Sequence, residues 1–369
     1  MAEVIIVGGG LGGLLTALQL ARTGIAATLF ERKQYPFHRV CGEYISNETV
    51  PFLRSLGAYP DDLNPPVISE LQLTSVNGRT ATVPLDLGGF GVSRYAFDAW
   101  LVQQVRAAGA IVHEQSEVTA IDFTGHGFDV AAEGKRWTAD VVIAAHGKRS
   151  RLDVALKRSF LRKRSPYVGV KYHIRYDQPR SRISLHNFEN GYCGISQVES
   201  NTTNLCYLVH RDMVKKHHHI PELEKVVLHR NPHLKEIFTN AEFLFDRPEV
   251  INEISFATKG PLEHHVLMGG DAAGMITPLC GNGMAMAIHA SKLLAEEVGT
   301  FCRGGVSRAE MEKRYTNRWN KLFAQRLWAG RQIQNLFGSE WASNLAVNLA
   351  RFAPPVAQFL VRQTHGAPF

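Results

Sequence analysis

The sequence predicts an α/β protein in which a parallel sheet carries an inserted antiparallel sheet and a helical C-terminal region. Three patterns indicate this architecture. Residues 4–30 read as strand, helix and strand, the unit from which parallel sheets are built. Residues 167–209 contain several short strands without helices between them, which is typical of an antiparallel sheet. Residues 301–369 have mostly helical spacing.

The first strand ends in a glycine-rich turn. Gly8, Gly10 and Gly13 fit the pattern G-x-G-x-x-G, and a helix and a second strand then lead to Glu31. The first glycine allows a tight turn, the second lets the main chain approach a pyrophosphate, and the third lets helix and strand pack closely. The helix N-terminus favours anionic phosphates. Glu31 is placed to accept a hydrogen bond from a ribose hydroxyl and disfavours a 2′-phosphate, so the pattern predicts FAD or NAD rather than NADP.

The next elements follow from local patterns. After a loop, a helix is expected to open at Cys41-Gly42-Glu43 and to end near Leu56. Alternating residues within 66–92, with a turn at Asn77-Gly78, predict a pair of strands. Further elements are expected in chain order as a helix after Ser93-Arg94, strands at 110–113, 118–123, 128–131 and 141–145, and then strands at 167–175, 182–185, 192–197 and 204–209.

The C-terminal third returns to a parallel-sheet pattern. A buried strand at 265–271 ends in glycine and acid, a long helix is expected from Gly283 to about Val298, and Ser307-Arg308-Ala309-Glu310 is a capping box. We therefore expect a Rossmann-like dinucleotide-binding domain that is discontinuous. Its segments are 1–65, 93–164 and 253–300, the substrate domain comprises 66–92 and 165–252, and a helical region covers 301–369.

Composition excludes several classes of protein. The net charge of +7 is densest at residues 157–164, which lack the flanking elements of a nucleic-acid module, so no nucleic-acid partner is expected. Five cysteines without a C-x-x-C pair argue against a disulfide framework or a dithiol reductase. The run His217-His218-His219 has no partner at ligand spacing, and no metal is expected.

The sequence also bears on location. The first motif starts close to Met1 and no apolar run is long enough to span a bilayer, so we expect a cytoplasmic protein with at most peripheral membrane contact. Residues 345–361 are rich in apolar side chains around Arg351 and a proline pair. We expect them to form a helix that covers the core of the dinucleotide domain, with membrane-surface binding as the alternative.

Three separated motifs resemble one family. Gly8-x-Gly10-x-x-Gly13 with Glu31, the stretch 269–274 (GGDAAG) and the stretch 278–284 (PLCGNGM) resemble FAD-dependent oxidoreductases of the glutathione-reductase-2 type. That group includes geranylgeranyl-reductase-like enzymes and single-component flavin monooxygenases. Arg39-x-Cys41-Gly42-Glu43, followed by Arg94-x-x-x-Asp98, is most similar to the geranylgeranyl-reductase-like branch.

The resemblance implies roles for particular residues. It places Asp271 on a ribityl or ribose hydroxyl and the turn at 278–283 against the flavin ring, where amide groups stabilise negative charge. Arg39 and Arg94 are suited to the pyrophosphate or the flavin edge. The cofactor-binding residues are expected to be Gly8, Gly10, Gly13, Glu31, Arg32, Arg39, Arg94, Gly270, Asp271, Gly281, Asn282, Gly283 and Met284.

Two positions depart from, or add to, the family pattern. Aromatic hydroxylases carry an acid where this chain has His146, which argues against NADPH handling in their manner; Lys148 and Arg149 are expected on a solvated loop. Cys41 is the candidate catalytic residue, because a thiol at the head of a helix favours the thiolate form and could donate a proton or shape the substrate pocket. The alternative is a small residue packed at the flavin edge.

These patterns predict a FAD-dependent oxidoreductase that acts on an apolar or aromatic natural-product-like molecule by hydride transfer at flavin N5. Phe188, Tyr192, Ile195 and Tyr207 are expected to line its pocket. One alternative is a flavin monooxygenase that hydroxylates an aromatic substrate, and another is a non-catalytic flavin-binding protein. Two electron sources stay open, NADPH or NADH and an electron-donor protein.

Overall fold

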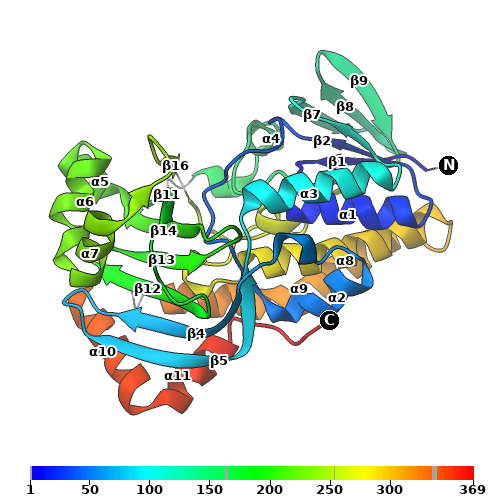
Figure 1. Ribbon diagram of the computed structural model, residues 1–369. Helices are drawn as coiled ribbons and strands as arrows, with labels where there is room; N and C mark the ends of the chain where they lie inside the picture. The colour runs from blue at the N-terminus through cyan, green and yellow to red at the C-terminus, as the bar shows by residue number, and fades with distance from the viewer. Residues whose placement is uncertain (1, 163–164, 253, 335–338) are drawn as a thin grey trace.

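The structure of the protein is a computed structural model that describes residues 2–162, 165–252, 254–334 and 339–369 (Figure 1). Lys163 and Arg164, which belong to the basic stretch at 157–164, lie outside the described residues, as does the predicted domain boundary at 253. Among the residues that the structure describes, no helix combines the length and apolar composition needed to cross a bilayer.

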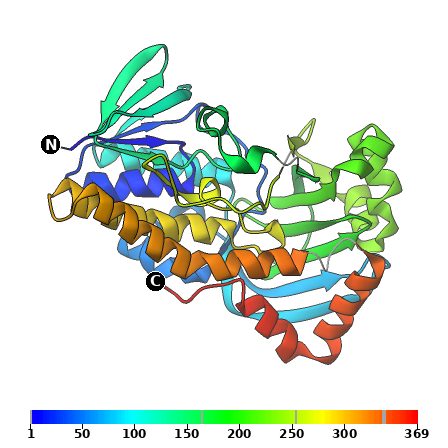
Figure 2. The same ribbon diagram turned by 180° about the vertical axis from the view of Figure 1, so that it is seen from behind.

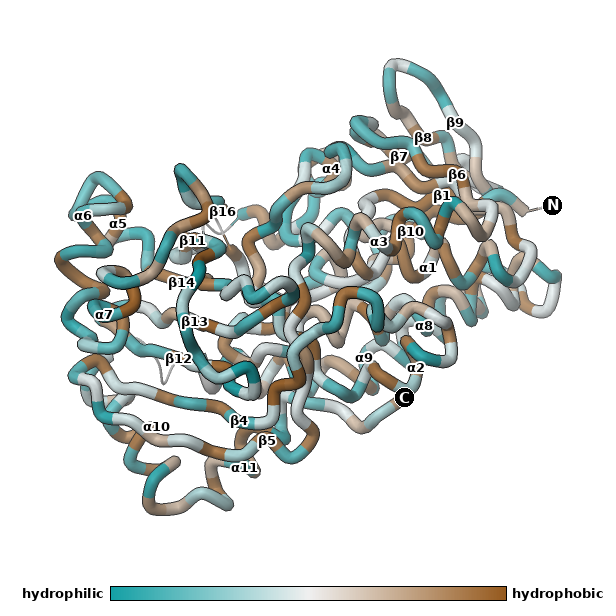
Figure 3. Tube along the Cα trace, viewed as in Figure 1, coloured by the Kyte–Doolittle hydropathy of each residue, from teal (hydrophilic) through white to brown (hydrophobic). Residues whose placement is uncertain are grey.

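A six-stranded sheet forms the centre of one half of the molecule, and all its pairings are parallel except that between the edge strand β17 and its neighbour. Its centre is fully buried, which is why β1 and β10 consist of apolar residues (Figure 3). In order across the sheet the strands are β17 (Leu262–Glu263), β18 (Val266–Met268), β10 (Val141–Ala144), β1 (Val4–Val7), β2 (Ala27–Phe30) and β6 (Ile111–His113). The predicted Rossmann-like fold is confirmed.

Helices and a small sheet enclose these strands (Figure 1). The helices are α1 (Leu11–Arg22), α3 (Arg94–Ala107) and α8 (Gly283–Cys302), with α9 (Arg308–Gln334) outside α8. The other face carries an antiparallel sheet of β7 (Val118–Phe123), β8 (Phe128–Ala132) and β9 (Lys135–Ala139), followed by the short helix α4 (Arg151–Ala155). The sequence interpretation omitted β9, a largely exposed strand whose polar residues give no apolar signal.

A nine-stranded sheet forms the second half and brings distant segments together. It is antiparallel except where β4 runs parallel to β12, with Leu71 opposite Ile183. In spatial order its strands are β15 (Glu242–Phe243), β11 (Tyr167–Arg175), β14 (Thr203–His210), β13 (Gly191–Gln197), β12 (Arg182–Phe188), β4 (Val67–Thr74), β5 (Thr80–Gly91) and β3 (Tyr44–Ser46), and β16 (Glu249–Asn252) also pairs with β11. One face is covered by α5 (Arg211–His217), α6 (Ile220–Val226) and α7 (Pro232–Asn240).

The helix expected from Cys41 to Leu56 is wrong in its first half. Glu43 has a left-handed backbone (φ 54°), which an α-helix cannot contain, and β3 then pairs with β5. A single 3-10 turn (Asn47–Thr49) follows, and only α2 (Val50–Ser55) is α-helical. Cys41 therefore lies in a loop before a strand rather than at the head of a helix.

The last two helices also differ from expectation. α10 (Glu340–Phe352) and α11 (Pro354–Arg362) are separate helices that divide at the proline pair. Instead of covering the dinucleotide core, α10 packs Val347 and Ala350 against Leu73 and Val83 of the second sheet. Both views show the two helices below β4 and β5, at the end of the molecule away from α1 (Figures 1 and 2).

Candidate functional site

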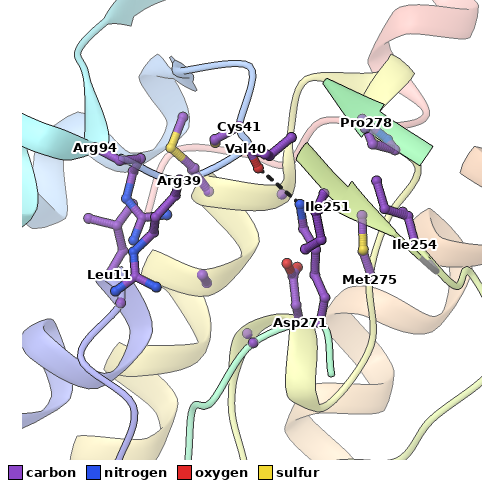
Figure 4. Close-up of a pocket in the computed structure, with 18 of the residues that line it drawn as sticks. Leu11, Arg39, Val40, Cys41, Arg94, Ile251, Ile254, Asp271, Met275 and Pro278 are labelled. Atoms are coloured by element: carbon purple, nitrogen blue, oxygen red, sulfur yellow. Dashed lines mark hydrogen bonds between the residues drawn. The ribbon is translucent and has the colours of Figure 1, made fainter. Parts of the chain in front are cut away.

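A cavity of about 500 Å³ lies between the two sheets. One end is formed by the glycine turn after β1 and by the loop that follows β10, both at the carboxyl edge of the parallel sheet. The other end is formed by β4, β12, β13 and β14. In Figure 4, Arg39 and Arg94 lie at one side, Ile254 and Met275 at the other, and Asp271 between them.

The glycine turn has the geometry that its motif predicts. Gly8 is left-handed (φ 103°), and a Cβ there would lie 2.5 Å from the carbonyl oxygen of Ala145 in the neighbouring strand's loop. A Cβ at Gly13 would overlap the carbonyl oxygen of Gly8, so helix and turn pack without a side chain between them. No side chain caps α1 and its first turn contains no acid. Its first N–H groups can therefore meet an anion.

Glu31 follows β2 and is buried beside this turn. Its carboxylate accepts from the Gly9 N–H (2.9 Å) and the Lys33 N–H (3.0 Å) and pairs with Arg39 (3.2 Å). The side chain therefore supports the glycine turn as well as bordering the cavity. Arg32 also borders the cavity and is exposed. The ribose contact assigned to Glu31 stays a prediction.

Arg39 and Arg94 meet on one carboxylate. Asp98 accepts from Arg39 Nε (3.0 Å) and from Arg94 Nε and Nη2 (2.7 Å each), and it is buried. A Cβ at Gly10 would lie 3.3 Å from Arg94 Nη2, so the two guanidinium groups stand against the glycine turn. Asp98 follows Arg94 by four residues, the spacing at which side chains meet on one face of a helix, so this contact could be expected from the sequence.

The loop after β10 is held by a buried carboxylate. Asp153 pairs with His146 Nε2 (3.0 Å) and with Arg158 Nη1 (3.0 Å). Burial would raise the pKa of Asp153, but the hydrogen bond from His146 and the other donors lower it to about 2. Arg158 is itself buried, so this member of the basic stretch is not on the solvated surface that composition suggested.

Lys148 is not on a solvated loop either. Its Nζ donates to the carbonyl oxygen of Val40 (3.0 Å), the bond drawn in Figure 4, and so ties the loop after β10 to the loop that carries Cys41. Lys259 Nζ in turn donates to the carbonyl oxygens of Lys148 (2.8 Å) and Asp271 (2.9 Å). Three segments that border the cavity are therefore joined by lysine side chains.

The strand-end motif and the predicted flavin-facing turn at 278–283 each contain one left-handed glycine, and the turn also contains the buried Asn282. Gly270 (φ 58°) precedes Asp271, and Gly281 (φ 64°) precedes Asn282 and the start of α8. Asn282 Nδ2 donates to the carbonyl oxygen of Thr364 (2.7 Å). Asp271, Gly281, Gly283 and Met284 border the cavity together with Gly270.

Cys41 borders the cavity, and its carbonyl oxygen accepts from Asn204 Nδ2 (3.2 Å). Because no helix begins there, the helix-based argument for a thiolate does not hold. Two residues further on, the carboxylate of Glu43 is fully buried and binds Lys171 Nζ, His173 Nε2 (2.7 Å) and the Arg94 N–H (2.8 Å). This Glu43 cluster (Glu43, Lys171 and His173) fixes the Cys41 loop to the second sheet.

Two opposing effects act on the pKa of Glu43. Burial would raise the pKa of Glu43, but Lys171 and His173 lower it to about 2. His38 lies beside His173, with ring centroids 5.0 Å apart. Burial and the nearby Lys171 lower the pKa of His38 to about 4, so its imidazole is neutral at pH 7. Sequence reasoning missed this cluster, although two polar residues on one face of the apolar strand β11 were a usable signal.

The opposite end of the cavity is apolar. Its wall includes a cluster of Tyr192, Leu208, Ile254 and Met275, extended by Leu185. Leu71 and Ile183 of the parallel strand pair complete it.

The residues expected to line the substrate pocket agree with the structure only in part. Tyr192 borders the cavity as expected, but Phe188 and Ile195 belong to the core on the other face of the sheet. Tyr207 borders the cavity, yet its hydroxyl donates to Glu224 of α6 (2.8 Å). Alternate strand residues face opposite sides, so an unknown register left this assignment undetermined.

The polar end of the cavity fits FAD. An uncapped helix N-terminus and two guanidinium groups suit a pyrophosphate. His146 Nδ1 is buried without a hydrogen-bond partner among the described residues, while Nε2 is hydrogen-bonded to Asp153, so Nδ1 can bond a polar group of the cofactor. Arg39, Arg94 and the first turn of α1 would hold the phosphates, and Asp271 would accept from a ribityl or ribose hydroxyl.

Comparisons with known proteins agree with this geometry. The family model described as "FAD binding domain" matches residues 1–327. Digeranylgeranylglycerophospholipid reductase 2 of Methanopyrus kandleri is 25% identical over 345 residues, which cover 88% of this chain and 83% of that protein.

Solved structures show the same fold. The flavin-dependent halogenase CmlS superposes with a TM-score of 0.77 at 20% identity, over 92% of this chain and 66% of the halogenase. A geranylgeranyl bacteriochlorophyll reductase-like protein of Thermoplasma acidophilum gives a TM-score of 0.76 at 17% identity, over 98% of this chain and 99% of that one. The chain therefore belongs to the FAD-binding-domain family of flavin-dependent enzymes.

Proposed function

We propose that this protein moves a hydride between its FAD and a carbon–carbon bond of an apolar small molecule. The observation that carries the proposal is the continuity of one cavity from the glycine turn to an apolar wall. Bound FAD supplies a two-electron centre at N5. The name of the Methanopyrus relative, a reductase of a digeranylgeranyl lipid, supports an isoprenoid-like or similarly unsaturated substrate.

The apolar wall orients the substrate and excludes water. Leu185, Leu208 and Ile254 offer the substrate no hydrogen-bonding side chain, so binding there depends on burial of apolar surface, about 25 cal/mol per Å². A charged or strongly polar molecule would lose its hydration without replacement. This favours an apolar substrate over a polar one.

Cys41 is the proposed proton donor in the reduction. A hydride added to one carbon of a double bond must be matched by a proton on the other. Cys41 borders the cavity on the loop held by Lys148 and by the Glu43 cluster. These contacts fix the position of the Cys41 main chain, which limits how far its thiol can move from the substrate.

The first experiment is an anaerobic half-reaction. The purified protein, with its flavin reduced by dithionite and the excess removed, is mixed with geranylgeraniol as a probe while flavin absorbance is followed. Reoxidation of the flavin with a gain of two hydrogens in the probe supports the proposal.

Anaerobic mixing with NADPH, and separately with NADH, followed by admission of oxygen, tests the monooxygenase alternative. Rapid flavin bleaching followed by oxygen insertion into an aromatic probe would overturn the hydride-transfer proposal. A flavin that stays oxidised with both nucleotides and is reduced by a ferredoxin or flavodoxin would identify a donor protein as the electron source.

A further inference from the structure

The C-terminal helices present a row of large apolar side chains to solvent. Trp341 is 74% exposed, Phe352 is 78% exposed and Phe359 is 58% exposed. Leu345 and Val356 on the same two helices, and Trp328 near the end of α9, are exposed as well. Single exposed apolar residues are ordinary, but several of them on two helices that contact each other indicate an interaction site.

The members of this row that belong to α10 lie on one side of the helix. Trp341, Leu345 and Phe352 are spaced by four and by seven residues, which places them on one face of a helix. Val347 and Ala350 lie on the opposite face and pack against β4 and β5. The inner face of α10 therefore has its partner within the protein, and the outer face has none among the described residues.

The chain segment that carries this row has a small excess of positive charge. From Trp328 to the last residue the chain carries Arg331, Arg351 and Arg362 against a single acid, Glu340. The Arg351 guanidinium lies 5.5 Å from the centre of the Phe352 ring, and Arg362 pairs with Asp86. Tryptophan and phenylalanine flanked by arginine suit the boundary between lipid tails and anionic headgroups.

The same helices adjoin the apolar end of the cavity. Leu185 packs both against the cluster that holds α10 (Leu73 and Val347) and against the cluster that forms the cavity wall (Tyr192 and Leu208). The exposed row and the substrate end of the cavity therefore lie on neighbouring parts of one sheet.

We propose that the outer face of α10 and α11 docks on the surface of a lipid bilayer that carries anionic headgroups. An apolar substrate dissolved in that bilayer then meets the protein at the end where the cavity is apolar. This reason for docking rests on the proposed function, whereas the docking itself does not.

Vesicle sedimentation tests the proposal with the flavin-loaded full chain. Phosphatidylcholine vesicles and vesicles of phosphatidylcholine with phosphatidylglycerol are used as probes. We expect binding to the anionic vesicles, weakened at least about tenfold by the triple substitution Trp341→Ser, Phe352→Ser and Phe359→Ser, because apolar burial drives interfacial binding. Arg351→Gln is expected to weaken binding to the anionic vesicles and to leave binding to the neutral ones unchanged.

The matched control replaces Val67, Ile111 and Val154 with serine, three apolar residues that are exposed elsewhere on the surface. It should bind as the unaltered protein does, and all variants should keep their flavin content and thermal midpoint. Absence of binding to both vesicles, or equal binding by the Trp341 triple variant, overturns the proposal. A dimer in light scattering that the triple substitution dissociates, without vesicle binding, would instead assign the face to a second copy.

Failure of docking and failure of hydride transfer can be told apart. Vesicle binding needs no turnover, and the anaerobic half-reaction with a detergent-dissolved probe needs no bilayer.

Discussion

The two ends of the cavity are built from different parts of the chain. The polar end is formed largely by main chain at strand ends and helix starts, such as Gly8, Gly10 and the turn before α8. The apolar end is formed by side chains that alternate along strands far apart in sequence, such as Leu71 and Leu185. Main-chain geometry tolerates few substitutions, whereas strand side chains can change without altering the fold. The polar end is therefore constrained by the fold, and the apolar end is free to vary.

Removing the charge of the Glu43 cluster, where the two ends meet, should have the largest effect. Glu43→Gln leaves Lys171 buried without a counter-ion, and we expect the free energy of unfolding to fall by about 3–5 kcal/mol. Urea denaturation measures this. Glu242→Gln, whose pair with Arg175 is exposed, is the control and should change stability little. A loss of unfolding free energy as small as in the control would show that the cluster does not stabilise the junction of the two ends.

The same substitution has a pH signature. The pKa of Glu43 is lowered from 4.5 to about 2, chiefly by Lys171. A carboxyl group with a lowered pKa stabilises the fold fully above its unfolded value, and that stabilisation is lost as pH falls through 4.5 toward 2. The stability difference between the unaltered protein and Glu43→Gln should therefore shrink in acid titration. A difference that stays constant down to pH 2 would contradict this assignment.

At the polar end, two neighbouring glycines should behave differently. A Cβ at Gly13 overlaps the Gly8 carbonyl, whereas a Cβ at Gly12 meets its nearest atom at 3.6 Å, an ordinary contact. Gly13→Ala should lower the free energy of unfolding by about 1–3 kcal/mol through overpacking, and it should also weaken FAD binding. Flavin content after gel filtration measures this, and Gly12→Ala is the matched control. Equal flavin content in both variants would remove the steric argument.

Asp271→Ala probes the cofactor end without disturbing its main chain. Loss of a charge-assisted hydrogen bond, about 1.5–3 kcal/mol, should weaken FAD binding roughly 10- to 100-fold. Fluorescence titration of the apoprotein with FAD gives the dissociation constant. Asp212→Ala, an exposed acid on α5, should bind as before. Undiminished FAD affinity in Asp271→Ala would refute the assigned role.

At the apolar end the effect should be confined to substrate binding. Leu71→Ala enlarges the substrate end and should raise the KM for an apolar substrate by roughly tenfold, as expected for about 1–3 kcal/mol of lost contact. The kcat and the flavin content should change little. Val67→Ala, on the same strand but exposed, is the control. A fall in flavin content instead would show that the two ends are not independent.

The cofactor end could be predicted from sequence because its signals are local. The glycine pattern, Glu31 and the strand that ends in Asp271 each lie within one continuous segment, and the structure brings them to one cavity. The site roles assigned to them, and the domain boundaries, stay predictions.

The features that could not be predicted from the sequence depend on long-range contacts. The Glu43 cluster joins residues about 130 positions apart in the chain, and no pattern around Glu43 indicates its partners. The left-handed backbone of Glu43, which removes the expected helix, is set by pairing of β3 with β5. The pocket residues on β12, β13 and β14 require a register that alternation alone does not supply.

The parallel pair of β4 and β12 has a consequence for synthesis of the chain. Strand β4 and its hairpin partner β5 leave the ribosome long before β12 exists, and α10, which covers them, is made near the end. Until then the hairpin offers an unpaired edge and the apolar residues Leu73 and Val83 to other chains. Nascent or C-terminally truncated chains should therefore aggregate through this hairpin, and expression at low temperature or with chaperones should raise the yield of native protein.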